Sequence, residues 1–90
     1  MQALILKEYG SAENLTLSRI PMPPSPSSSQ LLIKVKAAGV NPVDALIRAG
    51  YLAKMMPLGG FPAAVLGIDF AGEVVKVGDG VKDYSEGNYV

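Results

Sequence analysis

The sequence predicts a mainly β domain with one or two short helices. Apolar and polar residues alternate over residues 15–20 and 30–39, as they do in half-buried strands. An apolar run over residues 71–77 predicts another strand and leads to the turn dipeptide Asp79-Gly80. The spacing of apolar residues changes to a helical one over residues 41–50. Strands therefore dominate, with a helix inserted between them.

Length and charge exclude several classes of protein. Ninety residues make at most one small domain. Eight basic and eight acidic residues cancel, so long-range attraction to nucleic acid or to an anionic membrane is not expected. No run of apolar residues approaches the roughly 18 needed to cross a membrane. The first residues lack the pattern of a signal peptide, and we expect a cytoplasmic location.

The first part of the chain predicts strands joined by a proline-rich loop. We expect strands over residues 3–6, 15–20 and 30–39, and a loop over residues 22–29. Three prolines and four serines lie in that loop. In the strand that follows it, we expect Ile33 and Val35 to face inward and Lys34 and Lys36 to be solvated.

The predicted helix has a signal at each end. Asn41 is suited to the N-cap, Pro42 to the first helical position and Asp44 to the first turn. Arg48 falls in the last turn, and Gly50 is placed for a left-handed C-terminal cap. The sequence therefore predicts a helix of about two turns over residues 41–50.

Apolar residues continue across and beyond this helix. Val43, Leu46 and Ile47 recur at helical spacing and predict one apolar stripe. Residues 51–62 are rich in glycine, proline and methionine, which predicts an irregular loop that covers the core, a pocket or a partner. Residues 83–87 predict a further loop and residues 88–90 the start of a strand. We therefore expect residues 1–90 to form part of a larger domain.

The residue types narrow the possible chemistry. The chain has no cysteine and no histidine, so neither a zinc site nor a nucleophilic triad is expected. Asp44 and Asp69 each lie beside apolar residues and are candidates for acid or base chemistry in a cleft. The structural alternatives are helix capping for Asp44 and backbone hydrogen bonding for Asp69.

The glycines do not form a dinucleotide fingerprint. Gly67, Gly72 and Gly78 are too widely spaced for the G-x-G-x-x-G pattern between a strand and a helix. Gly78 and Gly80 follow a strand, but no helix is predicted after them. We interpret the glycines as sites of bulges, turns or close strand approach.

Residues 40–44, 47–51, 65–75 and 77–78 together resemble the start of a medium-chain dehydrogenase/reductase. Within that superfamily they are similar to the zinc-independent quinone oxidoreductase and enoyl reductase branch. The resemblance implies a GroES-like catalytic domain, a partly open β-barrel with short helices that is incomplete over this length. It also implies a Rossmann domain outside this chain, which binds NADPH and completes the enzyme.

The resemblance identifies the places where zinc enzymes of the superfamily carry their metal ligands. Asn41 stands in the place of a cysteine and Ile68 in the place of a histidine. Asp44 and Asp69 occupy the acidic positions beside them. This pattern implies a cleft without zinc, in agreement with the residue composition.

The resemblance also implies a reaction and a set of site residues. NADPH would transfer hydride to a small-molecule substrate, either a quinone or an activated alkene. Asn41 and Tyr51 would be the catalytic residues on the substrate side, donating hydrogen bonds to a developing oxyanion. Asp44, Arg48 and Asp69 would line the cleft. Full-length relatives are expected to form homodimers, and the 90-residue chain alone is expected to be inactive.

Alternatives remain open at this stage. Leu46 occupies a place where quinone reductases of this branch often carry a tyrosine, which leaves enoyl reduction open. A non-catalytic fragment or binding module with the same fold is a second hypothesis. A co-chaperonin is a third, because it shares the fold, but co-chaperonins lack the Asn-Pro-Val-Asp and Gly-x-Asp-Phe-Ala-Gly elements.

Overall fold

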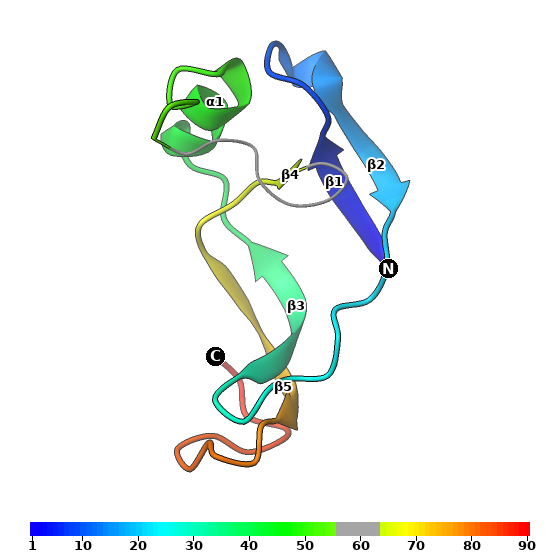
Figure 1. The fold of residues 1–90 in the computed structure, drawn as a ribbon, viewed down its shortest axis with the longest axis vertical. Helices are drawn as coiled ribbons and strands as arrows, with labels where there is room; N and C mark the ends of the chain where they lie inside the picture. Colours follow the sequence, from blue (N-terminus) through cyan, green and yellow to red (C-terminus); the bar gives the residue numbers. More distant parts are fainter. Residues whose placement is uncertain (56–63) are drawn as a thin grey trace. The chain divides into compact units, whose positions relative to one another are not determined.

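The computed structural model describes residues 1–55 and 64–90 (Figure 1). The chain divides into two compact units, which we describe one at a time. The first unit comprises Met1–Pro21 and Val40–Ile68, and the second comprises Met22–Gly39 and Asp69–Val90. The described elements are β1 (Gln2–Leu6), the 3₁₀ helix η1 (Ala12–Asn14), β2 (Leu15–Arg19), β3 (Leu31–Ala38), α1 (Pro42–Ala49), β4 (Ala64–Val65) and β5 (Phe70–Val77).

The first unit contains an antiparallel sheet with strand order β2-β1-β4. The central strand β1 places Ile5 opposite both Thr16 of β2 and Val65 of β4. Buried side chains on this strand include Ile5 and Leu6, and α1 contributes the buried Ile47. The predictions of strands over residues 3–6 and 15–20 are confirmed, with small shifts at their ends.

The turn after β1 is bonded to the end of α1. The Gly10 N–H donates to the Arg48 carbonyl at 2.9 Å. The Asn14 Nδ2 donates to the Tyr9 carbonyl at 3.1 Å, which closes the turn on its other side. These bonds tie the last turn of α1 to the β1–β2 connection.

The second unit is built on the antiparallel pair β3–β5. The pairing shifts register between Val35 and Ala37, and Gly72 lies opposite Val35. A Cβ atom on Gly72 would collide with the Lys34 carbonyl oxygen and would approach Ile33 Cγ2 to 2.8 Å. The interpretation of Gly72 as a site of close strand approach is therefore confirmed.

Two further segments are bonded to β5. The Gly72 N–H donates to the Val90 carbonyl at 2.8 Å and the Val90 N–H donates back at 2.9 Å, so the predicted strand start over residues 88–90 is confirmed as a bridge. At the end of β5, the Gly78 N–H donates to the Gln30 carbonyl at 2.8 Å. The Ser27 carbonyl oxygen lies where a Cβ atom of Gly78 would be. Glycine at position 78 therefore allows the segment around Ser27 to lie close to the end of β5.

Two predicted core positions are wrong. Val35 was expected to face inward, but 56% of its surface is exposed. The register shift between Val35 and Ala37 interrupts the alternation of inward and outward side chains in β3, and the described part of this sheet has only two strands. Leu46 was expected in the apolar stripe of α1, but it is 44% exposed, because the buried face of the helix is centred on Ile47 and Asp44. Lys34 and Lys36 are exposed as predicted.

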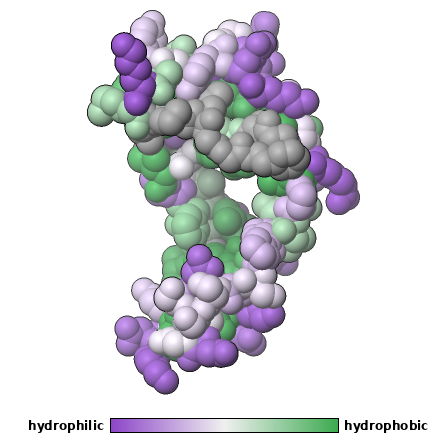
Figure 2. Space-filling view, viewed as in Figure 1, coloured by the Kyte–Doolittle hydropathy of each residue, from purple (hydrophilic) through white to green (hydrophobic). Residues whose placement is uncertain are grey.

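Figure 2 shows hydrophobic surface along the β3–β5 pair and hydrophilic surface on the loops after β5.

The structure confirms a mainly β chain with one α-helix and one 3₁₀ helix in its described part. The expected loop over residues 51–62 is described as turns up to Met55, and the rest of it lies outside the described residues. None of the described helices has both the length and the apolar character needed to cross a membrane.

Candidate functional site

The N-terminus of α1 is fixed by a reciprocal contact between Asn41 and Asp44. Asn41 has extended backbone angles (φ −124°, ψ 157°) and serves as the N-cap, with Pro42 at the first helical position. The Asp44 Oδ2 accepts a hydrogen bond from the Asn41 N–H at 2.8 Å, and the Asp44 N–H donates to the Asn41 carbonyl at 2.9 Å. The Asn41 side chain also accepts from the Asp44 N–H, so the two residues form a capping box, and the structural alternative of helix capping for Asp44 is confirmed.

Asp44 and Arg48 each carry a buried polar atom on the same face of α1. Asp44 is only 9% exposed, and its second oxygen, Oδ1, is buried without a hydrogen-bond partner among the described residues. The same holds for Nε of Arg48, which lies one helical turn further on. Residues four apart share a helix face, so an acceptor and a donor of complementary charge lie on the same side. An unpaired buried polar group costs about 1–3 kcal/mol, so neither residue is explained by packing alone.

The C-terminus of α1 fixes the backbone of Tyr51. Gly50 has φ 95° and donates to the Ile47 carbonyl at 3.1 Å, while the Tyr51 N–H donates to the Leu46 carbonyl at 3.1 Å. This is a Schellman ending, as the sequence predicted from Gly50. The Tyr51 side chain itself is 79% exposed. The phenol therefore extends into solvent from a fixed backbone.

The contact made by Tyr9 could not be predicted from the sequence. A Cβ atom on Gly50 would lie 3.1 Å from Cγ of Tyr9, so the ring of Tyr9 packs directly over the helix end. Such a contact joins residues that are distant in sequence and cannot be found from local patterns. Tyr9 thus supports the turn from which Tyr51 extends.

The two residues expected to be catalytic flank opposite ends of one helix. Asn41 precedes α1 and Tyr51 follows it. A helix of eight residues is about 12 Å long. Asn41 and Tyr51 are therefore held at separate positions, one at each end of the helix.

Asp69 belongs to the second unit, in which it lies against Gly39. The Gly39 N–H donates to the Asp69 carbonyl at 3.3 Å. The Asp69 carboxylate lies beside the Cα of Gly39, because a Cβ built there would collide with Oδ1 and come within 2.8 Å of Cγ. Asp69 is exposed to solvent. The predicted role of Asp69 in a cleft stays a prediction, and its backbone bonding to Gly39 is shown.

Two glycines of the described residues leave no space for the phosphates of a dinucleotide. The space beside Gly78 is filled by the Ser27 carbonyl oxygen, and the space beside Gly72 by the Lys34 carbonyl oxygen. Gly67 has φ 128°, a backbone conformation that favours glycine. Within the described residues, no three side chains of His, Cys, Asp or Glu converge as a metal site would require. The chemistry available at α1 is therefore hydrogen bonding by amide, phenol, carboxylate and guanidinium groups.

Known proteins share both the sequence and the fold. Residues 27–90 match the family described as "Alcohol dehydrogenase GroES-like domain". The whole chain aligns with the "Quinone oxidoreductase" of Rattus norvegicus at 41% identity and covers 26% of that protein. It aligns with the "NADPH-dependent alkenal/one oxidoreductase, chloroplastic" of Arabidopsis thaliana at 44% identity over 22% of that protein.

A solved structure shows the same arrangement of elements. The quinone oxidoreductase from Coxiella burnetii superimposes with a TM-score of 0.82 at 32% identity, over 99% of this chain and 28% of the other. The chain thus spans about a quarter of the length of the relatives that it matches. The Arabidopsis relative is described by its name as NADPH-dependent.

Proposed function

The chain belongs to the family of alcohol dehydrogenase GroES-like domains, in the quinone oxidoreductase branch of the medium-chain dehydrogenases/reductases, and we propose that it forms the substrate side of an NADPH-dependent oxidoreductase. The proposed reaction reduces a quinone or an activated alkene without zinc. The observation that carries the proposal is the N-terminus of α1, where Asn41 is held by Asp44 at the place that would carry a metal ligand in zinc enzymes.

Asn41 is proposed to stabilise the charge that develops on the substrate. Bound NADPH would supply a hydride, held by a domain outside this chain. When a carbon of an enone or quinone accepts a hydride, negative charge builds on the conjugated oxygen. An amide NH₂ has two donor hydrogens, and a donor placed at that oxygen lowers the barrier. A proton from solvent then completes the reduction.

Asp44 contributes by fixing the backbone from which that amide extends. Its Oδ2 accepts a hydrogen bond from the Asn41 N–H at 2.8 Å. The backbone of Asn41 cannot move away from the helix without losing this bond. A fixed donor need not reorganise when the charge forms, which is the main source of its catalytic effect. The role that we propose for Asp44 is thus positioning, with no proton transfer.

Tyr51 is proposed to contact a second part of the substrate. Its backbone is fixed by the bond to Leu46, and its phenol is exposed beyond the C-terminus of α1. The resemblance places Leu46 where quinone reductases of this branch often carry a tyrosine. This chain therefore lacks a phenol at that position, which leaves enone reduction open beside quinone reduction. Arg48 and Asp69 are proposed to line the cleft as charged groups.

The proposal is tested by Asn41→Asp in the full-length protein. Aspartate has nearly the same shape and can cap a helix, but as a carboxylate it donates no hydrogen bond. We expect kcat/KM for both a quinone and an enone to fall about 100-fold or more. Asn88→Asp is the matched control, because the Asn88 Oδ1 accepts a bond from the Ser85 N–H at 2.9 Å and aspartate keeps that acceptor. Unchanged activity of Asn41→Asp toward both substrates would overturn the proposal.

A further inference from the structure

Ser25 lies in the proline-rich segment before β3, and its hydroxyl contacts a lysine of β5. The Lys76 Nζ donates to the Ser25 Oγ at 3.2 Å, and both side chains are exposed. Ser25 is preceded by Pro24 and followed by Pro26. We propose that Ser25 is a phosphorylation site for a proline-directed protein kinase and that Lys76 pairs with the phosphate.

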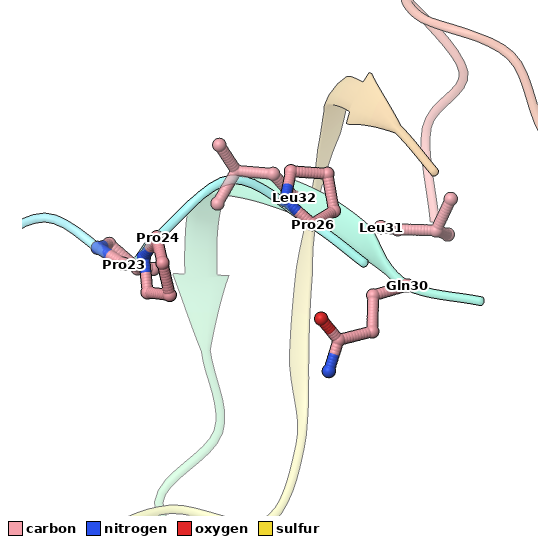
Figure 3. Close-up of a pocket in the computed structure, with 6 residues that line it drawn as sticks. All are labelled: Pro23, Pro24, Pro26, Gln30, Leu31 and Leu32. Carbon is pink, nitrogen blue, oxygen red and sulfur yellow. The ribbon is translucent and has the colours of Figure 1, made fainter. Parts of the chain in front are cut away.

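The neighbours of Ser25 favour an extended backbone without regular secondary structure. A residue before proline is held to extended or polyproline II angles, and Pro24 and Pro26 have no N–H to offer to a sheet. Residues 22–26 contain neither helix nor strand. Figure 3 shows Pro23, Pro24 and Pro26 following one another along this extended stretch. A kinase could therefore bind the stretch without unfolding β3.

The other serines of the segment are held differently. The Ser27 N–H donates to the Gln30 Oε1 at 3.0 Å, and the Gln30 N–H donates to the Ser27 carbonyl at 3.0 Å. The Ser28 carbonyl accepts the Gly80 N–H at 2.8 Å. These bonds make residues 27–30 a fixed turn against the end of β5. In the described part of the chain, Ser25 makes its hydrogen bond only through its side chain, so it can be lifted from the surface at little cost.

The modification places an anion beside an existing cation. The kinase would transfer the γ-phosphoryl group of ATP. The new bond joins Ser25 Oγ to phosphorus, the bond from phosphorus to the β–γ bridging oxygen breaks, ADP leaves and the hydroxyl proton passes to the base of the kinase. The phosphate adds about −1.5 to −2 charges near neutral pH. Its oxygens fall within reach of Lys76, whose Nζ already lies 3.2 Å from Oγ.

The pairing would fix one wall of a neighbouring pocket. A cavity of about 350 Å³ is lined by Pro23, Pro24, Pro26, Gln30, Leu31 and Leu32 (Figure 3). Pro24 and Pro26 are the two neighbours of Ser25 along the chain. Lys76 belongs to β5, opposite Leu32 of β3. A phosphate held by Lys76 would therefore tie the proline wall of the pocket to the sheet that forms its floor.

The test is phosphorylation of the full-length protein by a recombinant proline-directed kinase with ATP, followed by site assignment by mass spectrometry. Within residues 1–90 we expect one phosphate, on Ser25, and none on Ser27, Ser28 or Ser29, which are exposed but lack a following proline. Ser25→Ala should abolish incorporation within these residues. A phosphate on another serine of residues 1–90, or none on Ser25 in the wild type, would overturn the site.

The role of Lys76 is tested on the phosphorylated protein by ³¹P NMR. A nearby ammonium favours the dianionic phosphate, so the pKa of the phosphoserine should be lower in the wild type than in Lys76→Met, with the difference reduced by salt. Lys82→Met is the matched control, because Lys82 is an exposed lysine in the loop after β5. Equal titration curves for the wild type and Lys76→Met would overturn the pairing.

Discussion

The carboxylate of Asp44 holds the backbone of Asn41, three residues earlier. Oδ2 accepts the Asn41 N–H at 2.8 Å, while the Asp44 N–H returns a bond of 2.9 Å to the Asn41 carbonyl. The candidate substrate contact is therefore positioned from within the first turn of its own helix. A change at Asp44 reaches Asn41 without any contact between Asp44 and the substrate.

Asp44→Ala should destabilise the N-terminus of α1. Loss of a capping side chain costs about 1 kcal/mol, and Asp44→Asn should cost less because an acceptor oxygen remains. Urea unfolding measures the free energy, and amide hydrogen exchange at Asn41 should speed up in the alanine variant. Equal losses for alanine and asparagine would show that the acceptor at Asp44 contributes nothing.

Ile47→Ala should destabilise the protein far more than Leu46→Ala. Ile47 is 7% exposed and packs in the core of the first unit, whereas its neighbour Leu46 is 44% exposed. Truncation of a buried isoleucine costs about 2–5 kcal/mol, and that of a half-exposed leucine much less. Thermal unfolding of the two variants under the same conditions makes the comparison. The reverse order would mean that α1 buries its other face.

Gly78→Ala should disturb the end of β5. The added methyl group would meet the Ser27 carbonyl oxygen, which is backbone and cannot rotate away. Forced backbone shifts of this kind cost about 1–3 kcal/mol. The exposed neighbour Asp79→Ala is the control and should change stability by no more than about 0.5 kcal/mol. A neutral Gly78→Ala would show that the segment around Ser27 moves freely.

Tyr51→Phe should leave folding unchanged and affect catalysis selectively. The phenol is exposed, and the backbone bond from Tyr51 to Leu46 does not need it. Loss of one neutral hydrogen bond is worth about 0.5–1.5 kcal/mol, so kcat/KM should fall up to about 10-fold. Steady-state kinetics with a quinone and with an enone would show which substrate uses the hydroxyl. Unchanged kinetics with both would remove Tyr51 from the site.

Zinc should be neither bound nor required. The chain has no histidine and no cysteine, and Asn41 and Ile68 stand where the resemblance places soft ligands. Metal analysis of the purified protein should find zinc well below one equivalent, and a chelator should leave the reductase rate unchanged. A zinc-dependent alcohol dehydrogenase treated in parallel is the control. Stoichiometric zinc whose removal abolishes activity would contradict this prediction.

The helix could be predicted in full because its signals are local. Asn41, Pro42, Asp44 and Gly50 each act within one turn of the chain, and the structure places α1 at Pro42–Ala49 with both expected caps. The positions of β1, β2, β3 and β5 were predicted for the same reason, since strand patterns extend over a few residues, whereas the two-residue strand β4 was not predicted. Gly72 and Gly78 were correctly interpreted as backbone features, although their contacting partners were unknown.

The relations between distant segments could not be predicted. Val35 was assigned to the interior by alternation, but the register shift in its pairing with β5 depends on a partner some 35 residues away. The contact of Tyr9 with Gly50 and that of Asp69 with Gly39 also join distant parts of the sequence. The candidate residues around α1 were found from sequence, whereas the exposure of the Tyr51 side chain and the burial of Asp44 required the structure.

The bonds from residues 88–90 to Gly72 and Val74 have a consequence for how the chain meets other chains. A strand with an unpaired edge is a template for adding a foreign strand, which leads to aggregation. In the described part of the second unit, β5 is paired with β3 on one side and bonded to Asn88 and Val90 on the other. That stretch of β5 therefore has no open edge, and self-association through strand addition would have to begin elsewhere.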